Sequence, residues 1–225
     1  MKRMLFIFVF CTVFSLSTKT AMSSETISFA DTIQGVDSIV GWSSNNNEVD
    51  LSTSSLSLLG GNATLSTSLG DLTHRLTRGL GVAGGENDEV DRVNGIEHIY
   101  ITFDAIDYYV NSIEVRSLFD QDVTGSPNAE WGAIDFWLNG SVVDTVYLQG
   151  NNSVLGDAFW TGPSILVDKL DFYIPASVTD INFNPALSEF AVAKVNVTAI
   201  PVPGALFLGL FGLVSLKRLK LRKIT

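Results

Sequence analysis

Residues 131–148 of this chain read Trp131-Gly-Ala-Ile-Asp-Phe-Trp-Leu-Asn-Gly-Ser-Val-Val-Asp-Thr-Val-Tyr-Leu148. Two runs of β-branched and aromatic residues flank the pair Asn139-Gly140. Both residues of this pair can adopt the positive φ that a type I′ turn requires. The stretch therefore predicts a β-hairpin.

Similar short alternating runs recur along the middle of the chain, and helical periodicity is nearly absent. About ten strands without crossover helices are typical of an antiparallel β-sandwich. We expect an all-β, jelly-roll-like sandwich over residues 24–198, between an N-terminal signal helix and a C-terminal apolar helix. Besides the hairpin, the expected strands are 99–104, 112–116, 170–174, 178–184 and 190–198, with two or three shorter ones within 41–72.

The C-terminal segment, residues 199–225, differs from the rest. A Pro-x-Pro breaker precedes an apolar run, Gly204–Leu216, and a cluster of five basic residues follows it. As a helix the run is about 20 Å long, whereas the hydrocarbon core of a membrane is about 30 Å thick. So short a segment suits either a temporary membrane handle or a permanent anchor, and the sequence leaves both open.

In their order, these three parts resemble the PEP-CTERM sorting signals of Gram-negative bacteria, in the variant with a Val-Pro-x-Pro-like opening. The resemblance is confined to the tail, and the usual Glu between the prolines is replaced by Val202. It implies an exosortase-type membrane enzyme as partner and a cargo that belongs to extracellular polysaccharide or biofilm material. The residues that carry the signal are Pro201, Pro203, Gly204, Lys217 and Arg218.

The N-terminus predicts export. Lys2 and Arg3 precede an apolar run over 5–14 and a small, polar stretch, which together are typical of a signal peptide over residues 1–23. We expect export across the inner membrane, tethering to that membrane by the C-terminal segment, and then a cell-surface or extracellular location. The one cysteine, Cys11, lies in the signal peptide, so the exported chain would have no disulfide.

The charge is strongly uneven. All 24 acidic residues of the chain lie within 25–194, with six basic residues, which gives this stretch a net charge of −18. So acidic a surface repels nucleic acid and anionic lipid. It suits cations and neutral or cation-bridged polymers.

A glycine-rich acidic loop within 79–95 is the candidate metal site. Oxygen ligands in a loop that glycine lets bend are what Ca²⁺ requires, although the spacing is not that of an EF-hand. A solvated acidic loop is the alternative. The predicted calcium ligands are Glu86, Asp88, Glu89 and Asp91.

No catalytic motif accompanies these features. The chain has two histidines, His74 and His98, which excludes a three-histidine zinc site. Glycoside hydrolysis needs only two carboxylates, so composition does not exclude it. We nevertheless expect a protein that is not an enzyme.

Aromatic residues on the hairpin suggest a binding role. Trp131 and Trp137 share one parity, whereas Ile134 and Phe136 share the other. The two tryptophans would either bind polysaccharide on an exposed face or fill a packed one. The expected function is a structural or adhesive matrix protein, and the alternative is a calcium-assisted carbohydrate-binding module.

The sorting interpretation can be tested with tags. A tag placed after Thr225 should be absent from the mature protein, whereas a tag after Ser24 should remain, as immunoblotting of cell fractions would reveal. Replacing Pro201 and Pro203 with Ala should leave export intact and block processing. One membrane-bound species that keeps both tags would instead identify a permanent anchor.

Overall fold

The computed structural model describes residues 24–30, 53–58, 61–75, 77–83, 89–92, 95–104, 107–119, 129–151, 153–180 and 182–200. The predicted signal peptide and the sorting residues from Pro201 onward lie outside these ranges. None of the described segments forms a helix long and apolar enough to cross a membrane.

The described part of the chain is all-β, as the sequence predicts, and contains twelve strands and no helix. Most of the predicted strands are present within one or a few residues of their expected bounds. The strands are β1 (Ser24–Ser28), β2 (Thr53–Leu58), β3 (Gly61–Thr67), β4 (Leu72–Arg75), β5 (Gly79–Val82), β6 (His98–Asp104), β7 (Tyr108–Arg116), β8 (Trp131–Leu138), β9 (Ser141–Gln149), β10 (Ala158–Val167), β11 (Lys169–Tyr173) and β12 (Ala191–Ala199).

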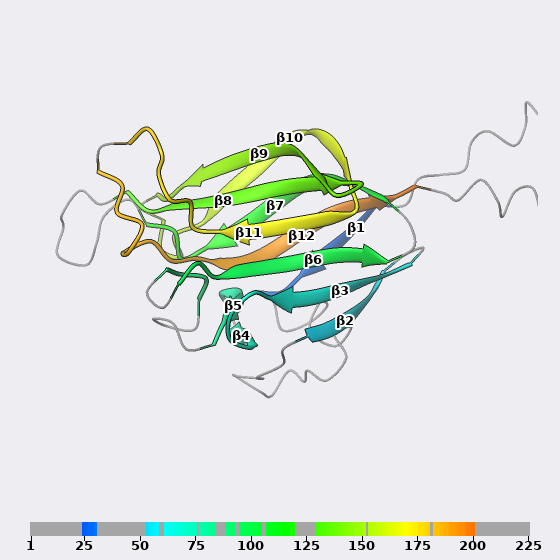
Figure 1. Cartoon of the computed structure of the whole chain (residues 1–225), viewed down its shortest axis with the longest axis horizontal. Helices are drawn as coiled ribbons and strands as arrows, with labels where there is room; N and C mark the ends of the chain where they lie inside the picture. Colours follow the sequence, from blue (N-terminus) through cyan, green and yellow to red (C-terminus); the bar gives the residue numbers. More distant parts are fainter. Residues whose placement is uncertain are drawn as a thin grey trace, which may run out of the picture. The chain divides into compact units, whose positions relative to one another are not determined.

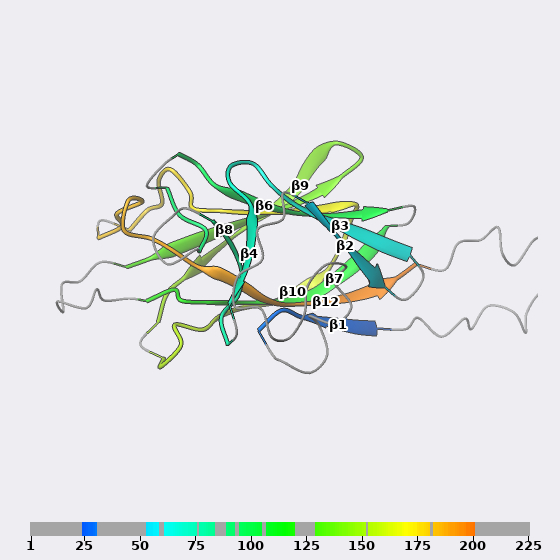
Figure 2. The same cartoon turned by 90° about the horizontal axis from the view of Figure 1, so that it is seen from below.

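The strands form two antiparallel sheets (Figures 1 and 2). Sheet A has the order β10-β7-β12-β5-β4, with β1 also paired to β12, and sheet B has the order β2-β3-β6-β11-β8-β9. Within them the pairs β8–β9, β7–β10, β6–β11 and β5–β12 are nested around the β8–β9 hairpin. Distant segments of the chain are thereby brought together around that hairpin.

The turn of this hairpin has the predicted geometry. Asn139 has φ 53° and Gly140 has φ 75°, so both central residues are left-handed as a type I′ turn requires. Leu138 pairs with Ser141 directly across the turn. The two-residue loop therefore fixes the pairing next to the turn, and a β-bulge between Phe136 and Trp137 shifts the register by one residue farther along the hairpin.

One hydrophobic core lies between the sheets. Alternate residues of several strands, such as β6 and β7, point into it. The ring pairs Phe103–Tyr108 and Phe136–Trp160 join sheet B to sheet A with centroids 4.8 and 4.9 Å apart. Burying one such side chain contributes about 1.5–3 kcal/mol to folding. All of these residues lie in the compact unit Ser24–Ala199.

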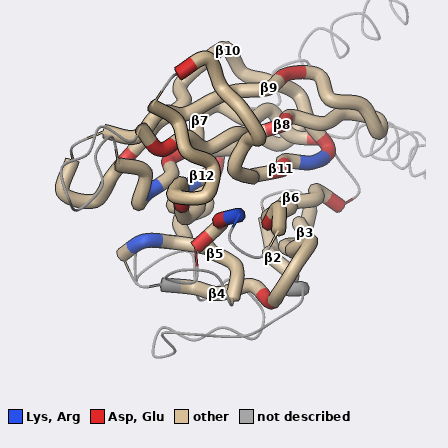
Figure 3. The backbone as a smooth tube through the Cα atoms, turned by 60° about the vertical axis from the view of Figure 1, so that its left-hand side comes forward, with Lys and Arg blue, Asp and Glu red and all other residues tan. Residues whose placement is uncertain are grey.

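The ends of this unit lie side by side, since Ser24 pairs with Thr198. The connections near these ends are short, such as Asn139-Gly140 and the single residue Asp168. The register places the other ends of these strands on the opposite side of the unit. The connections that join the strands there are long: 83–97, 117–130, 150–157 and 174–190. Acidic positions are spread over both sheets and outnumber basic ones (Figure 3).

The strand predicted over 178–184 is wrong, because this segment forms turns in the β11–β12 connection. The carboxylate of Asp180 accepts a hydrogen bond from the backbone N–H of Asn182 (2.9 Å), and the side chain of Asn184 accepts one from Ala186 N–H (3.1 Å). Asp and Asn favour such local turns over a strand ladder. The apolar residues between them gave a misleading alternation.

Two neighbouring residues of β8 test this layout. Phe136 is fully buried, so Phe136→Ala should leave a cavity and lower the free energy of unfolding by about 3–5 kcal/mol. Trp137 is half-buried on the opposite face, so Trp137→Ala should cost about half as much. Urea denaturation of both variants would measure the difference, and equal losses would contradict the assigned faces.

Candidate functional site

The outer face of sheet B carries the candidate site. Residues that alternate with the core-facing ones form rows across the sheet, with directly opposed side chains about 4.5–5.5 Å apart at their Cβ atoms. Three rows lie next to one another. They are Thr64–Thr102–Lys169–Trp137, then Ser66–Tyr100–Asp171–Asp135–Thr145, and then His98–Tyr173–Ala133–Tyr147.

Five of these side chains pack against one another in a continuous series, which we call the stacked column: Trp137, Lys169, Tyr100, His98 and Tyr173. The Lys169 ammonium lies 3.9 Å from the ring centroid of Trp137 and 5.2 Å from that of Tyr100. The imidazole of His98 stacks on Tyr100 at 5.6 Å and on Tyr173 at 5.2 Å. The column crosses β8, β11 and β6, the middle of sheet B.

Two carboxylates hold the column in place. Asp171 accepts a hydrogen bond from Nδ1 of His98 (2.8 Å), and Asp135 accepts one from the Tyr173 hydroxyl (3.3 Å). Thr145 donates a second hydrogen bond to Asp135 (2.6 Å). Burial, followed by the charge of Asp135, raises the pKa of the Tyr173 hydroxyl, so Tyr173 remains a hydrogen-bond donor at neutral pH.

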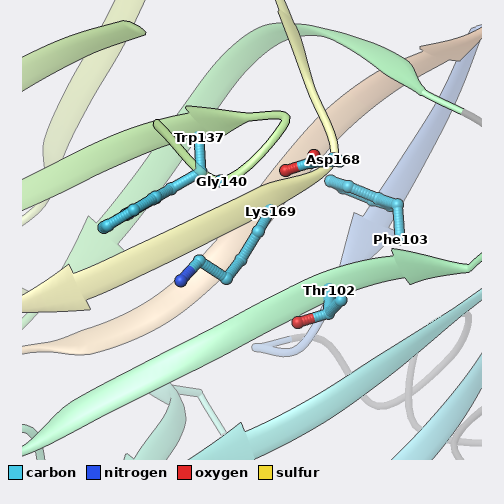
Figure 4. Close-up of a pocket in the computed structure, with 6 residues that line it drawn as sticks. All are labelled: Thr102, Phe103, Trp137, Gly140, Asp168 and Lys169. Atoms are coloured by element: carbon cyan, nitrogen blue, oxygen red, sulfur yellow. The ribbon is translucent and has the colours of Figure 1, made fainter. Parts of the chain in front are cut away.

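An open hollow of about 410 Å³ adjoins the column at its Trp137 end (Figure 4). Asp168 on its wall accepts a hydrogen bond from the backbone N–H of Asn139 (2.6 Å), which ties the β10–β11 turn to the hairpin. Nε1 of Trp137 is buried without a hydrogen-bond partner. The hollow is lined by Thr102, Phe103, Trp137, Gly140, Asp168 and Lys169.

The outer face of sheet A differs in chemistry. Its centre is a network of small neutral polar groups: Nδ2 of Asn111 donates to the side chains of Asn196 (2.8 Å) and Thr198 (2.9 Å). Ser164 donates to Asn111 (2.8 Å), and Ser24 donates to Asn196 (3.0 Å). These groups satisfy one another's hydrogen-bonding capacity. The contacts between a cationic side chain and aromatic rings that the described residues make lie on sheet B instead.

The predicted binding residues lie on this face of sheet B, but only one of them belongs to the column. Trp131 and Trp137 are half-buried, whereas Ile134 and Phe136 are in the core. The two tryptophans therefore do not fill the core between the sheets, and their role in binding stays a prediction. Nε1 of Trp131 donates to Asp180 of the β11–β12 connection (3.4 Å), so this ring packs toward the long loops.

Half of the predicted calcium set lies outside the described residues, namely Glu86 and Asp88. Glu89 and Asp91 are buried. Glu89 forms an ion pair with Arg78 and accepts a hydrogen bond from Ser117 (2.9 Å), while its other oxygen has no hydrogen-bond partner. Among the described residues, three or more metal-binding side chains do not gather at any point. Calcium binding by this loop stays a prediction.

Tyr173 is among the aromatic residues that the sequence offers for stacking on sugars, whereas Lys169, Tyr100 and His98 were missed as binding residues. These residues belong to two short stretches in which apolar residues alternate with the outward-facing ones: His98-Ile-Tyr-Ile-Thr102 and Lys169-Leu-Asp-Phe-Tyr173. Alternation predicts which side chains face outward, but it does not predict that these two strands are neighbours. That pairing comes from the nested topology.

Comparison of the chain with protein-family models, curated proteins and solved structures finds no match. The candidate site therefore rests on its geometry and chemistry.

Two buried carboxyl groups near the long loops make stability depend on pH. Burial raises the pKa of Glu97 to about 7, and burial together with the carboxylates of Glu189 and Glu89 raises that of Glu130 to about 8. The folded state thus retains protons that the unfolded state releases near pH 4.5. The contribution of these two groups to the free energy of unfolding is therefore fully present below that pH. It falls as the pH rises and is lost once the pH exceeds the pKa values of the folded state.

The melting temperature of the unit 24–200 should accordingly fall between about pH 4.5 and 8. The double variant Glu97→Gln with Glu130→Gln keeps both acceptors and should flatten this slope, as calorimetry would measure. Asp144→Asn, at an exposed position, is the control and should keep the slope. A melting temperature that rises over this range in the unmodified chain would contradict the assignment.

Proposed function

We propose that this protein is an exported surface or extracellular-matrix protein whose jelly-roll-type β-sandwich binds extracellular polysaccharide along the outer face of sheet B. The nested strand pairs support the jelly-roll assignment, because such folds wind paired strands into two packed sheets. A fold of this kind hosts many functions, so the function is argued from the face.

The observation that carries the proposal is the stacked column. A sugar chain offers hydroxyl groups and apolar C–H surfaces, and sites for such ligands combine aromatic rings with a few fixed polar groups. The column provides rings from Tyr100, Tyr173 and Trp137. The carboxylates of Asp135 and Asp171 hold it in a fixed arrangement, which reduces the entropy lost on binding.

A binding role fits these carboxylates better than a catalytic one. Asp171 accepts from His98, and Asp135 accepts from Tyr173 and Thr145. Both therefore fix neighbouring side chains. We propose no reaction at this face, and adhesion to the polymer accounts for the structural role expected of the protein.

Delivery to the surface completes the proposal. We propose that a signal peptide exports the chain and that an exosortase-type enzyme recognises the tail at the inner membrane. Both ends of the described unit, β1 and β12, belong to sheet A. The proposed binding face belongs to the other sheet, sheet B. Calcium bound by the acidic loop would support this role and is part of the proposal.

Matched tyrosine variants test the binding face. Tyr173→Ala removes one ring of the column, whereas Tyr109→Ala removes a half-buried ring from the outer face of sheet A. In sedimentation with extracellular polysaccharide from the producing cells, Tyr173→Ala should weaken binding about tenfold, or about 1.4 kcal/mol. Tyr109→Ala should bind like the unmodified protein. Equal losses in the two variants, or none in either, would refute the assigned face.

A further inference from the structure

Lys169 occupies an unusual position for a lysine in this chain. It lies on β11 in the middle of sheet B, and its ammonium lies between the rings of Trp137 and Tyr100. Cation–π contacts of this kind contribute about 0.5–1 kcal/mol at exposed sites. The rings hold the cation in place without neutralising its charge.

Three other basic side chains of the described part have carboxylate partners, whereas Arg92 donates to the backbone carbonyl of Ile174. Arg116 binds Glu114 at 2.8 Å, Lys194 binds the same carboxylate at 3.1 Å, and Arg78 forms an ion pair with Glu89. Lys169 makes no ion pair with any carboxylate that the structure describes. In a chain with 24 acidic and 14 basic residues, an unpaired lysine is the unexpected case.

The carboxylates nearest to Lys169 in the register already have donors of their own. Asp171 accepts from His98, Asp135 accepts from Tyr173, and Asp168 accepts from the backbone of Asn139. The ammonium of Lys169 keeps its three donors for a group from outside. It lines the same hollow as the ring-bearing side chain of Trp137.

We infer that Lys169 receives the carboxylate of an acidic sugar, so that the proposed polysaccharide ligand contains uronate units. This inference rests on the proposed function and names its ligand class. An ammonium next to a hollow binds a carboxylate as a point charge with hydrogen bonds.

Two carboxylates close to Lys169 oppose this contact, Asp168 in the same hollow and Asp171 two residues along β11, but both already accept hydrogen bonds. The rest of the negative charge of the domain lies farther away. At physiological ionic strength charges farther apart than about 8 Å are largely screened from one another. A uronate at Lys169 would lie well within that distance of the ammonium. The distant acidic residues therefore affect the rate of encounter more than the bound state.

Two probes that differ only in charge test the inference: polygalacturonate and the same polymer after reduction of its carboxyl groups. Binding is measured by affinity electrophoresis with the full chain in mild detergent. The unmodified chain should bind the acidic polymer about tenfold more tightly. Lys169→Met keeps the apolar stem and should lose this preference. Lys169→Arg should retain much of it.

Lys194→Met is the control, because it removes an ion-paired lysine from the outer face of sheet A. It should leave the preference unchanged. Equal binding of both polymers by the unmodified chain, or a preference that survives in Lys169→Met, would overturn the inference and leave the proposed function intact. Binding of neither polymer by the unmodified chain would also overturn the inference, whereas the proposed function is tested separately by sedimentation with polysaccharide from the producing cells.

Discussion

The two-residue alternation of side chains along the central strands of sheet B is the constraint on which the rest of the structure depends. Because Ile134 and Phe136 must enter the core, Asp135 and Trp137 must leave it. The same rule on β11 buries Leu170 and turns Lys169 outward. A shift of one residue in either strand would exchange the core for the surface. The outer face thus derives its composition from the requirement that the inner face be apolar.

This constraint also explains why the stacked column is well ordered. Residues that are far apart in the sequence become direct neighbours through the pairs β6–β11 and β11–β8. Cross-strand spacing brings their rings into contact without a loop to position them. A site built on strands is more rigid than one built on loops. The long connections at the end opposite Ser24 hold the buried acidic residues, and these make that end sensitive to pH.

Much of the fold is predictable from the sequence, and the hairpin is its clearest part. Asn139-Gly140 and the alternation around it predict β8 and β9 from local residues alone, whereas the bulge that shifts their register between Phe136 and Trp137 was not predicted. The failure at 178–184 has a local cause as well, since Asp180 and Asn184 form turns where the apolar residues suggest a strand. Less of the site was predictable. Trp137 was identified, whereas Tyr100, His98 and Lys169 were not, because their role depends on strand neighbours that only the three-dimensional structure supplies.

The central claim is that the outer face of sheet B binds polysaccharide, and a heteronuclear NMR titration tests it most directly. Residues 24–200 would be titrated with extracellular polysaccharide from the producing cells. The account predicts that the largest shifts fall on the indole N–H of Trp137 and on the backbone amides of β6, β8 and β11. Shifts confined to the long connections or to sheet A would contradict it.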